Sequence, residues 1–507
     1  MSAPFSAALA TSGPVLSDLA AGSEPGSLKF GTSGLRGLVT DLIGLPTRAY
    51  SLAFVLHVLD QSPQTTHVLV GRDLRSSSEA IAGDCMAAIR QAGLEPVDCG
   101  ELPTPALALE AQRQGFPAIM VTGSHIPDDR NGLKFYLAKG EISKADETAI
   151  LNIHGGFDDA TLRALAGAAP GTVSTNVEAC PRYIKRYVSF FRADSLKGLR
   201  IGVYQHSSVA RDILVELLRA MGAEVVGVGR ADRFVPVDTE AHDPEQVAYI
   251  ERIARSGAFD AIVSTDGDAD RPLVADEKGK ILRGDVLGLL AAKLLNMHTM
   301  VTPVTSGSVI EACGFAERVI RTRVGSPYVV AAMEEAAVSG DGGIIGFEAN
   351  GGTLLHSSVI GTDGSLLEAL PTRDAVLPII ASLMPIARSG LPLSKIIQGL
   401  DVGYALADRL KDVPSALSLR LLKRLADEEN FAHQYFLEVG DIVAMSKLDG
   451  VRFQFADGAV IHYRASGNAP ELRCYVEAKE ENRASDLLKW GLEAAFHQLA
   501  RKGQLPI

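Results

Sequence analysis

The chain has 507 residues, of which 47% are hydrophobic and 22% charged, so it can build several buried cores and divides into three or four domains at roughly 100–200 residues each. Its formal net charge of −12 argues against a nucleic-acid-binding surface, although local arginines and lysines can still bind an anionic substrate. The five cysteines are scattered without a CxxC spacing, which indicates reduced thiols and no disulfide or zinc framework.

Residues 1–26 are rich in Ala, Ser and Gly and contain no Lys or Arg. They lack the basic start of a secretory signal peptide, so we expect a loose, flexible extension. The best apolar run, residues 375–387, is interrupted by Pro378 and Pro385 and falls short of the ~20 residues that span a bilayer. We therefore expect a cytoplasmic protein without membrane contacts.

Residues 29–37 form a glycine-rich segment, Lys-Phe-Gly-Thr-Ser-Gly-Leu-Arg-Gly. Glycines allow backbone N–H groups to approach an anion closely, and the guanidinium of Arg36 could bind that anion through two parallel hydrogen bonds. Glycine loops are common, so this segment alone is a weak signal.

A strand–helix–strand pattern follows, with a strand at 67–71, a helix at 76–91, a strand beginning at 95–97 and a buried strand at 116–121. The last strand runs into Thr-Gly-Ser-His-Ile-Pro. In open α/β sheets, ligands bind at the edge where such strands end. Ser124 is therefore a candidate nucleophile or phosphate carrier, with His125, Arg130 and Lys134 as nearby cationic or titratable groups; an ordinary polar turn is the alternative.

The same pattern returns with strands at 199–204, 224–228 and 259–265 and a helix at 209–221. It ends in a loop with Asp266, Asp268 and Asp270. If this segment is extended, the three carboxylates point the same way and need a cation, for which Mg²⁺ or Ca²⁺ is suited. An EF-hand is disfavoured because Arg271 replaces the required glycine and a strand precedes the loop. A solvated acidic turn is the other alternative.

A third copy comprises a strand at 300–304, a helix at 327–338 and a segment at 343–352 that ends in Phe-Glu-Ala-Asn-Gly-Gly. Glu348 could accept hydrogen bonds from vicinal sugar hydroxyls, although a surface glutamate in a glycine turn fits this loop equally well. The three units resemble structural repeats whose sequences have diverged.

The remaining segment differs in pattern. Residues 451–455 and 459–464 alternate like half-buried antiparallel strands joined by an Asp-Gly turn, a third strand covers 472–478, and a helix covers 484–500. The segment Arg464-Ala-Ser-Gly-Asn-Ala-Pro-Glu-Leu-Arg473 combines a guanidinium, a hydroxyl and an amide at a turn, which suits a phosphate; an ordinary hairpin turn is the alternative. We expect a separate α+β domain here.

Taken together, the four loops resemble those of the α-D-phosphohexomutase family over residues 28–480. The matching motifs are Thr-Gly-Ser-His-x-Pro with Asn131-Gly and Lys134, Asp-Gly-Asp-x-Asp-Arg, a glycine-flanked glutamate, and Arg-x-Ser-Gly-x-x-Pro. In this order and at this spacing they are highly specific, and they are most similar to the bacterial phosphomannomutase/phosphoglucomutase branch.

The resemblance implies three similar α/β domains with mixed sheets and a C-terminal α+β lid domain around a central cleft. The expected division is an extension at 1–26, a first domain with the phosphoserine loop at 27–170, a second with the metal loop at 171–283, a third with the sugar loop at 284–398, and a fourth with the phosphate loop at 399–507.

It also implies an isomerase that interconverts hexose 6-phosphate and hexose 1-phosphate, chiefly of mannose and also of glucose. Ser124 would carry the phosphoryl group, Mg²⁺ would be the cofactor, and a hexose 1,6-bisphosphate would be the intermediate and activator. The implied catalytic residues are Ser124, His125, Lys134, Arg36 and Arg271, the metal ligands are Ser124, Asp266, Asp268 and Asp270, and the substrate-binding residues are Glu348, Asn350, Arg464, Ser466, Gly467, Asn468 and Arg473.

Two departures from the family motifs affect the substrate. The sugar loop usually reads Gly-Glu-x-Ser-Gly, often followed by His, whereas Asn350 takes the Ser place here and Gly352 the His place. The phosphate loop has Asn468-Ala469 where many members have Thr-Glu. A phosphoglucosamine mutase, a seryl-phosphate metal-dependent phosphatase and a non-catalytic sugar-phosphate sensor are the alternatives. The partners expected are sugar phosphates, without nucleic acid or membrane, and the expected assembly is a monomer or homodimer.

Overall fold

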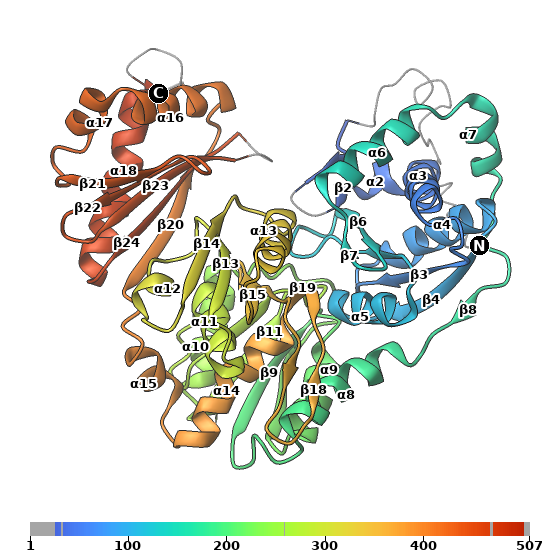
Figure 1. The fold of residues 1–507 in the computed structure, drawn as a ribbon, viewed down its shortest axis with the longest axis horizontal. Helices are drawn as coiled ribbons and strands as arrows, with labels where there is room; N and C mark the ends of the chain where they lie inside the picture. Colours follow the sequence, from blue (N-terminus) through green and yellow to red (C-terminus); the bar gives the residue numbers. More distant parts are fainter. Residues whose placement is uncertain (1–25, 32–33, 258, 467–469, 501–507) are drawn as a thin grey trace, which may run out of the picture.

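A computed structural model of the protein describes residues 26–31, 34–257, 259–466 and 470–500. Within these residues, four sheets of four to eight strands follow one another along the chain (Figure 1). We call the parts of the chain that carry them the first to fourth domains. The mixed sheets of the first three and the antiparallel sheet of the fourth confirm the predicted fold class, in which three α/β units precede an α+β unit. The predicted domain boundaries stay predictions.

The first domain is built on a mixed sheet in the order β1-β2-β6-β5-β3-β4-β8, with β7 added beside β6. Its strand β5 is buried on both faces, as expected for a central strand of a sheet covered by helices. The strands are β1 Lys29–Phe30, β2 Leu35–Leu38, β3 His67–Arg72, β4 Glu95–Glu101, β5 Ala118–Val121, β6 Arg130–Leu137, β7 Gly140–Glu141 and β8 Ser174–Thr175. The helices are α2 Val39–Leu42, α3 Leu45–Gln61, α4 Ser78–Gln91, α5 Thr104–Gln114, α6 Lys144–Gly155 and α7 Asp159–Ala166.

The second domain has the strand order β10-β9-β11-β12, in which β12 alone runs antiparallel to its neighbour. Its elements are α8 Ala179–Phe191, β9 Arg200–His206, α9 Arg211–Ala220, β10 Glu224–Arg230, α10 Pro244–Ala254, β11 Ala261–Thr265 and β12 Pro272–Ala275. The loop with the three aspartates joins β11 to β12.

The third domain repeats this plan with the order β14-β13-β15-β16-β19 and a small hairpin, β17-β18. Its strands are β13 Thr299–Pro303, β14 Arg318–Thr322, β15 Ile344–Phe347, β16 Thr353–Leu355, β17 Val359–Ile360, β18 Leu366–Leu367 and β19 Leu370–Asp374. Its helices are α11 Gly284–Leu295, α12 Val309–Ala312, α13 Ser326–Val338, α14 Val376–Ser389 and α15 Leu393–Gln398.

The fourth domain has an antiparallel sheet in the order β20-β24-β23-β22-β21. Strands β22 and β24 alternate between buried and half-buried residues, because helices cover one face of the sheet. Its elements are β20 Tyr404–Leu410, α16 Ser415–Asp427, α17 Glu429–Tyr435, β21 Ile442–Ser446, β22 Val451–Phe455, β23 Val460–Ala465, β24 Leu472–Ala478 and α18 Glu481–Ala500.

The apolar run at 375–387 forms most of α14, which contains Pro385 within its length. The helix is buried and packs against α11. None of the helices in the described residues is both long and apolar enough to cross a membrane.

Among the described residues, clusters of buried hydrophobic side chains connect the first three domains but do not extend to the fourth. One continuous hydrophobic cluster includes Leu69 in the first sheet, Val263 in the second and Phe347 in the third. The fourth domain has its own cluster, which contains Phe453 and Leu487 and stays within that domain. Three of the domains are therefore packed around one shared hydrophobic core, which makes them a shared body, and the fourth has a separate core.

Candidate active site

Ser124 lies in the loop after β5, at the edge of the first sheet where its parallel strands end. Its side chain is buried, and its φ of 57° is a left-handed conformation that residues other than glycine adopt rarely. The Ser124 amide donates to Thr122 Oγ1 at 2.7 Å, and Arg75 Nη2 donates to the Ser124 carbonyl at 3.0 Å. Held in this way, Ser124 Oγ donates to Asp266 Oδ2 of the second domain at 2.6 Å.

Arg75 holds this loop through hydrogen bonds to its backbone carbonyls, and the sequence alone did not identify this residue. Its Nε pairs with Asp73 Oδ2 at 3.2 Å, and both side chains are completely buried. A Cβ on Gly123 would lie 2.6 Å from Arg75 Cζ, so the loop needs glycine at that position. The signal in the sequence was the charged Arg-Asp-Leu-Arg segment directly after a buried strand.

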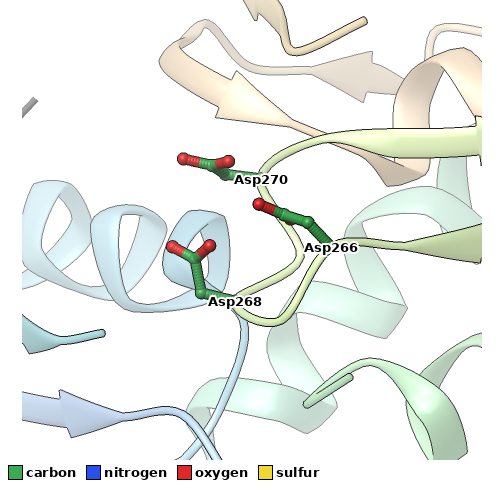
Figure 2. Close-up of side chains that lie close together, drawn as sticks. All are labelled: Asp266, Asp268 and Asp270. Carbon is green, nitrogen blue, oxygen red and sulfur yellow. The ribbon is translucent and has the colours of Figure 1, made fainter. Parts of the chain in front are cut away.

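The three aspartates converge because their loop turns, not because it is extended. The Asp266 amide donates to the Arg271 carbonyl at 3.0 Å, and Ala269 has a left-handed φ of 60°. One oxygen from each of Asp266, Asp268 and Asp270 lies within 4.8 Å of the others, and all three side chains are buried (Figure 2). The predicted convergence is present, but its geometric basis differs from the extended segment that was assumed.

This setting contradicts both alternatives for the aspartate loop. The loop joins two paired strands, β11 and β12, whereas an EF-hand loop joins two helices. The burial of the three side chains rules out a solvated acidic turn.

Cations hold one oxygen of Asp268 and of Asp270. Lys134 Nζ donates to Asp268 Oδ2 at 2.6 Å and to Asp270 Oδ2 at 2.5 Å. Thr104 Oγ1 also donates to Asp268 Oδ2, at 2.5 Å, and Arg373 Nη2 lies 2.8 Å from Asp270 Oδ2. The Oδ1 atoms of both aspartates are buried and accept no hydrogen bond from the described residues, although Arg271 Nε lies 3.7 Å from Asp270 Oδ1.

These Oδ1 atoms fit a metal ion. A buried carboxylate oxygen without a partner is costly, and hard oxygen ligands suit Mg²⁺ or Ca²⁺. The triplet is the single group of three or more carboxylate, histidine or cysteine side chains in the described residues that could hold a metal ion.

Burial and neighbouring charges shift the pKa values of Asp266 and Asp270 in opposite directions. Burial raises the pKa of Asp266 well above its ordinary value, and the charges of Asp268 and Asp270 add to this effect. Burial acts in the same direction on Asp270, but Arg373, Lys134 and Arg271 outweigh it and hold the Asp270 pKa far below its ordinary value. Added positive charge near Asp266 would therefore stabilise its ionised form.

His125, Arg271 and Arg36 lie beside Ser124, and the two arginines supply positive charge there. Arg271 Nη1 donates to His125 Nδ1 at 3.0 Å, and that nitrogen is 3.2 Å from Ser124 Oγ. Burial, followed by the charges of Arg271 and Arg36, holds the pKa of His125 well below its ordinary value, so the ring is neutral at pH 7. Burial and the charges of Arg271 and Arg373 lower the pKa of Arg36 to about 10, which leaves it protonated at pH 7.

Arg373 is the most important residue that sequence reasoning missed. It is completely buried at the end of β19, where it pairs with Asp270 and its Nη1 donates to Glu348 Oε2 at 3.2 Å. The next residue, Asp374, accepts hydrogen bonds from the hydroxyls of Tyr183, at 2.6 Å, and Tyr187. An Arg-Asp pair directly before the apolar run at 375–387 was the available signal for a buried charged site.

The glutamate loop lies between β15 and β16 and is closed by backbone hydrogen bonds and by a bond from the backbone to the Asn350 side chain. The Glu348 amide donates to the Gly352 carbonyl at 3.1 Å, and the Gly352 amide donates to Asn350 Oδ1 at 3.0 Å. Glu348 is buried, which does not support the alternative of a surface glutamate. A Cβ on Gly352 would lie 2.8–3.1 Å from the Arg373 Cβ, Cγ and Cδ atoms, so glycine here leaves room for that arginine.

Of the predicted phosphate residues that the structure describes, Arg464 and Arg473 lie on the fourth sheet and Ser466 follows β23, outside the network of contacts around Ser124. Arg464 on β23 is directly opposite Arg473 on β24, and its Nε pairs with Asp449 Oδ2 at 3.0 Å. The Ser466 amide donates to the Glu471 carbonyl at 3.0 Å. The remaining two predicted phosphate residues, Gly467 and Asn468, lie outside the described residues.

A cavity of about 480 Å³ opens between the first, third and fourth domains, and Arg464 lines it. Cations from all three domains face this space, which makes it suitable for an anion. The cationic residues in its lining are Lys144, Arg323, Lys447 and Arg464.

Four domain families match the chain in sequence. They are described as phosphoglucomutase/phosphomannomutase alpha/beta/alpha domain I at residues 27–156, domain II at 181–279 and domain III at 283–401, and as the phosphoglucomutase/phosphomannomutase C-terminal domain at 420–489.

Curated relatives and solved structures agree with these matches. A phosphomannomutase of Sinorhizobium fredii is 50% identical, over 92% of this chain and 98% of its own, and a phosphomannomutase of Salmonella muenchen is 42% identical, over 94% and 97%. The crystal structure of a phosphoglucomutase/phosphomannomutase family protein from Burkholderia thailandensis shares the fold, with a TM-score of 0.69 at 21% identity over 92% of this chain and 97% of that one.

Proposed function

The chain belongs to the phosphoglucomutase/phosphomannomutase family of α-D-phosphohexomutases, and from this premise we propose that it interconverts mannose 6-phosphate and mannose 1-phosphate, and glucose phosphates as well. It is a mutase, an isomerase that moves a phosphoryl group within a hexose phosphate. The mannose assignment is supported by the relatives at 50% and 42% identity, both of which are phosphomannomutases.

The observation that carries the proposal is the bond between Ser124 Oγ and Asp266 Oδ2, at 2.6 Å across two domains. It places a hydroxyl in a strained loop against a buried acidic triplet and a rim of cations. A hydroxyl held in this way can carry a phosphoryl group, because the surrounding charges offset the charge of the phosphate in both the ground state and the transition state.

In the proposed cycle, the phosphoryl group leaves the Ser124 oxygen and bonds to the free hydroxyl of a hexose 1- or 6-phosphate, which gives a hexose 1,6-bisphosphate. The bisphosphate reorients, and its other phosphoryl group returns to Ser124. Arg36, Arg271 and Lys134 offset charge on the transferring group. His125 and Lys134 are the proposed groups that move the proton of the sugar hydroxyl.

The same residues would hold a divalent cation. Asp266, Asp268 and Asp270 would bind Mg²⁺ together with the phosphate on Ser124. The ion would supply positive charge at the transferring phosphoryl group. The Oδ1 atoms of Asp268 and Asp270, which accept no hydrogen bond from the described residues, support this assignment. Free hexose 1,6-bisphosphate would serve as activator, because it can phosphorylate a Ser124 that has lost its phosphate.

The sugar and its second phosphate would be held by the third and fourth domains. Glu348 would accept hydrogen bonds from the sugar hydroxyls, and Asn350 could both accept from them and donate to them. Arg464, Ser466 and Arg473, with Gly467 and Asn468 of the same loop, would bind the phosphate that is not reacting.

A coupled assay with glucose 1,6-bisphosphate present tests this function. It is run with mannose, glucose and glucosamine phosphates, and inorganic phosphate is measured in parallel. We expect isomerisation of mannose 1-phosphate and glucose 1-phosphate without stoichiometric phosphate release. Phosphate release without isomerisation would indicate a seryl-phosphate phosphatase, and binding without either reaction would indicate a sensor.

A further inference from the structure

Two acidic side chains of the fourth domain bind backbone N–H groups of the third. Asp449 Oδ2 accepts from the Val324 amide at 3.0 Å, and Glu477 Oε2 accepts from the Ser308 amide at 2.7 Å. Both amides lie just before helices of the third domain, α13 and α12. These charged hydrogen bonds therefore dock one domain on the other where the hydrophobic clusters do not join.

Each acid also pairs with an arginine of its own domain, but the two arginines differ in position. Glu477 Oε1 lies 3.4 Å from Arg452 Nη2, which donates to Ser308 Oγ at 2.7 Å, so this arginine is used in docking. Asp449 Oδ2 instead lies 3.0 Å from Nε of Arg464, an ion pair without the geometry of a hydrogen bond, and Arg464 lines the 480 Å³ cavity. Asp449 therefore contacts both the third domain, through the Val324 amide, and a residue that lines the cavity, Arg464.

The turn that carries Asp449 is fixed to the strand that carries Arg464. His462 Nε2 donates to the Asp449 carbonyl at 2.6 Å, and His462 belongs to β23, as does Arg464. Gly450 has a φ of 78°, and a Cβ there would lie 2.1 Å from the Tyr463 carbonyl oxygen. The carboxylate is therefore held in a constant position relative to the Arg464 backbone.

Asp449 is also the one carboxylate among the described residues that line this cavity, where four cationic side chains face it. A carboxylate beside an anion site weakens anion binding by repulsion. This cost can be offset if the carboxylate orients a cation that binds the anion. The attraction of the carboxylate for the Nε side of the guanidinium leaves the terminal nitrogens as the edge available to a phosphate. It also restricts the rotamers of a long side chain that would otherwise lose entropy on binding.

We propose that Asp449 is a positioning residue: it orients the Arg464 guanidinium toward the cavity and ties that orientation to the docking of the fourth domain on Val324. The proposal rests on the proposed function, because it takes the anion at Arg464 to be the phosphate of a hexose phosphate. Glu477 makes the equivalent docking contact without orienting a residue of the cavity.

Steady-state kinetics of Asp449→Asn and the matched control Glu477→Gln test this role. Both changes replace an acid by an amide that can still accept from the third-domain N–H, so both weaken docking in a comparable way. We expect Asp449→Asn to raise KM for the hexose phosphate about tenfold with a much smaller change in kcat, because the arginine must be ordered at each binding event. Glu477→Gln should change KM less than about twofold. Asp449→Glu, which restores the charge, should recover part of the loss.

A double-mutant cycle separates positioning of Arg464 from a general loosening of the domain. In an Arg464→Ala background, Asp449→Asn should add less than about twofold to KM, because its target is absent. Equal KM increases in the Asp449 and Glu477 variants, additive effects in the cycle, or a wild-type or lowered KM for Asp449→Asn would overturn the proposal. A wild-type protein that fails to isomerise any hexose phosphate would instead overturn the proposed function. Circular dichroism and thermal unfolding of each variant confirm that KM is measured on folded protein.

Discussion

The first three domains and the fourth are joined to the rest of the molecule by different interactions. The first three share one hydrophobic cluster, and the contacts of Ser124, Asp266, Lys134, Asp270 and Arg373 run across their boundaries in a buried network. The fourth has a cluster of its own and touches the third through charged hydrogen bonds at half-buried side chains. In Figure 1 the fourth and first domains lie on opposite sides of the picture, and residues of both line the 480 Å³ cavity.

This difference corresponds to two demands of phosphoryl transfer. The groups that stabilise the transferring phosphoryl group must keep their geometry within fractions of an ångström, which a shared close-packed core provides. The grip on the far phosphate must be released so that the bisphosphate can turn, and polar docking contacts exchange with water at low cost. We therefore expect changes in the shared body to lower kcat and changes on the fourth domain to raise KM.

Ser124→Ala should have the largest effect, because it removes the phosphate carrier from the shared body. We expect kcat to fall by roughly four orders of magnitude or more. The fold should persist, since both residues meet the same steric limits at a φ of 57°. Intact-mass measurement of active wild-type protein should show a phosphate adduct that the variant lacks. Near-normal turnover of the variant would disprove the assigned role of Ser124.

Asp268→Asn should have the next largest effect. Asp268 is buried and binds Lys134 and Thr104, so the amide loses charge where a cation is expected and leaves Lys134 with one carboxylate partner fewer. We expect more than about a hundredfold loss of kcat and of metal affinity. Metal affinity is measured by calorimetry, and activity is measured after exhaustive chelation and after readdition of Mg²⁺. Full activity of the chelated wild type would contradict a metal-dependent site.

Gly352→Ala tests whether the interior of the shared body tolerates a single methyl group. The new Cβ would overlap Arg373, whose guanidinium pairs with both Asp270 and Glu348, so we expect about a tenfold loss of kcat and about 1–3 kcal/mol of stability. Gly342→Ala is the matched control, because a Cβ at that glycine meets no atom within 4 Å. Equal effects of the two variants on kcat and on the free energy of unfolding would show that Arg373 has room to move.

The sequence predicted what depends on local pattern. Apolar runs that end in polar loops predicted β5, β11 and β15 and the loops that follow them, and alternation predicted β22, β23 and β24. The predicted class of fold is confirmed. The convergence of the three aspartates was also expected, although it is produced by a turn with Ala269 in a left-handed conformation and not by an extended segment.

What the sequence did not reveal depends on contacts between distant residues. Arg373 pairs with Asp270, 103 positions away, and Thr104 donates to Asp268 across 164 positions. Neither residue stands in a recognised motif. The Arg373-Asp374 pair before an apolar run was an indirect sign at most, because the burial of both residues follows from domain packing. The shared core also depends on contacts between distant elements. The apolar run of α14 is interrupted by prolines in the sequence, yet it forms a buried helix that packs on α11.

Arg464→Ala should have the smallest effect of these variants on kcat, and it tests the fourth domain's side of the comparison. We expect KM for the hexose phosphate to rise about tenfold or more and kcat to fall by a smaller factor, since binding of the far phosphate supplies the energy for closing the site. Formation of the phosphoserine at Ser124 should survive, because Arg464 lies outside the network around that residue. Kinetics, intact mass and small-angle scattering with and without glucose 1-phosphate measure the three quantities. A variant that loses kcat as severely as Asp268→Asn with an unchanged KM would mean that the fourth domain is part of the transfer machinery, and the division between a fixed body and a releasable grip would be wrong.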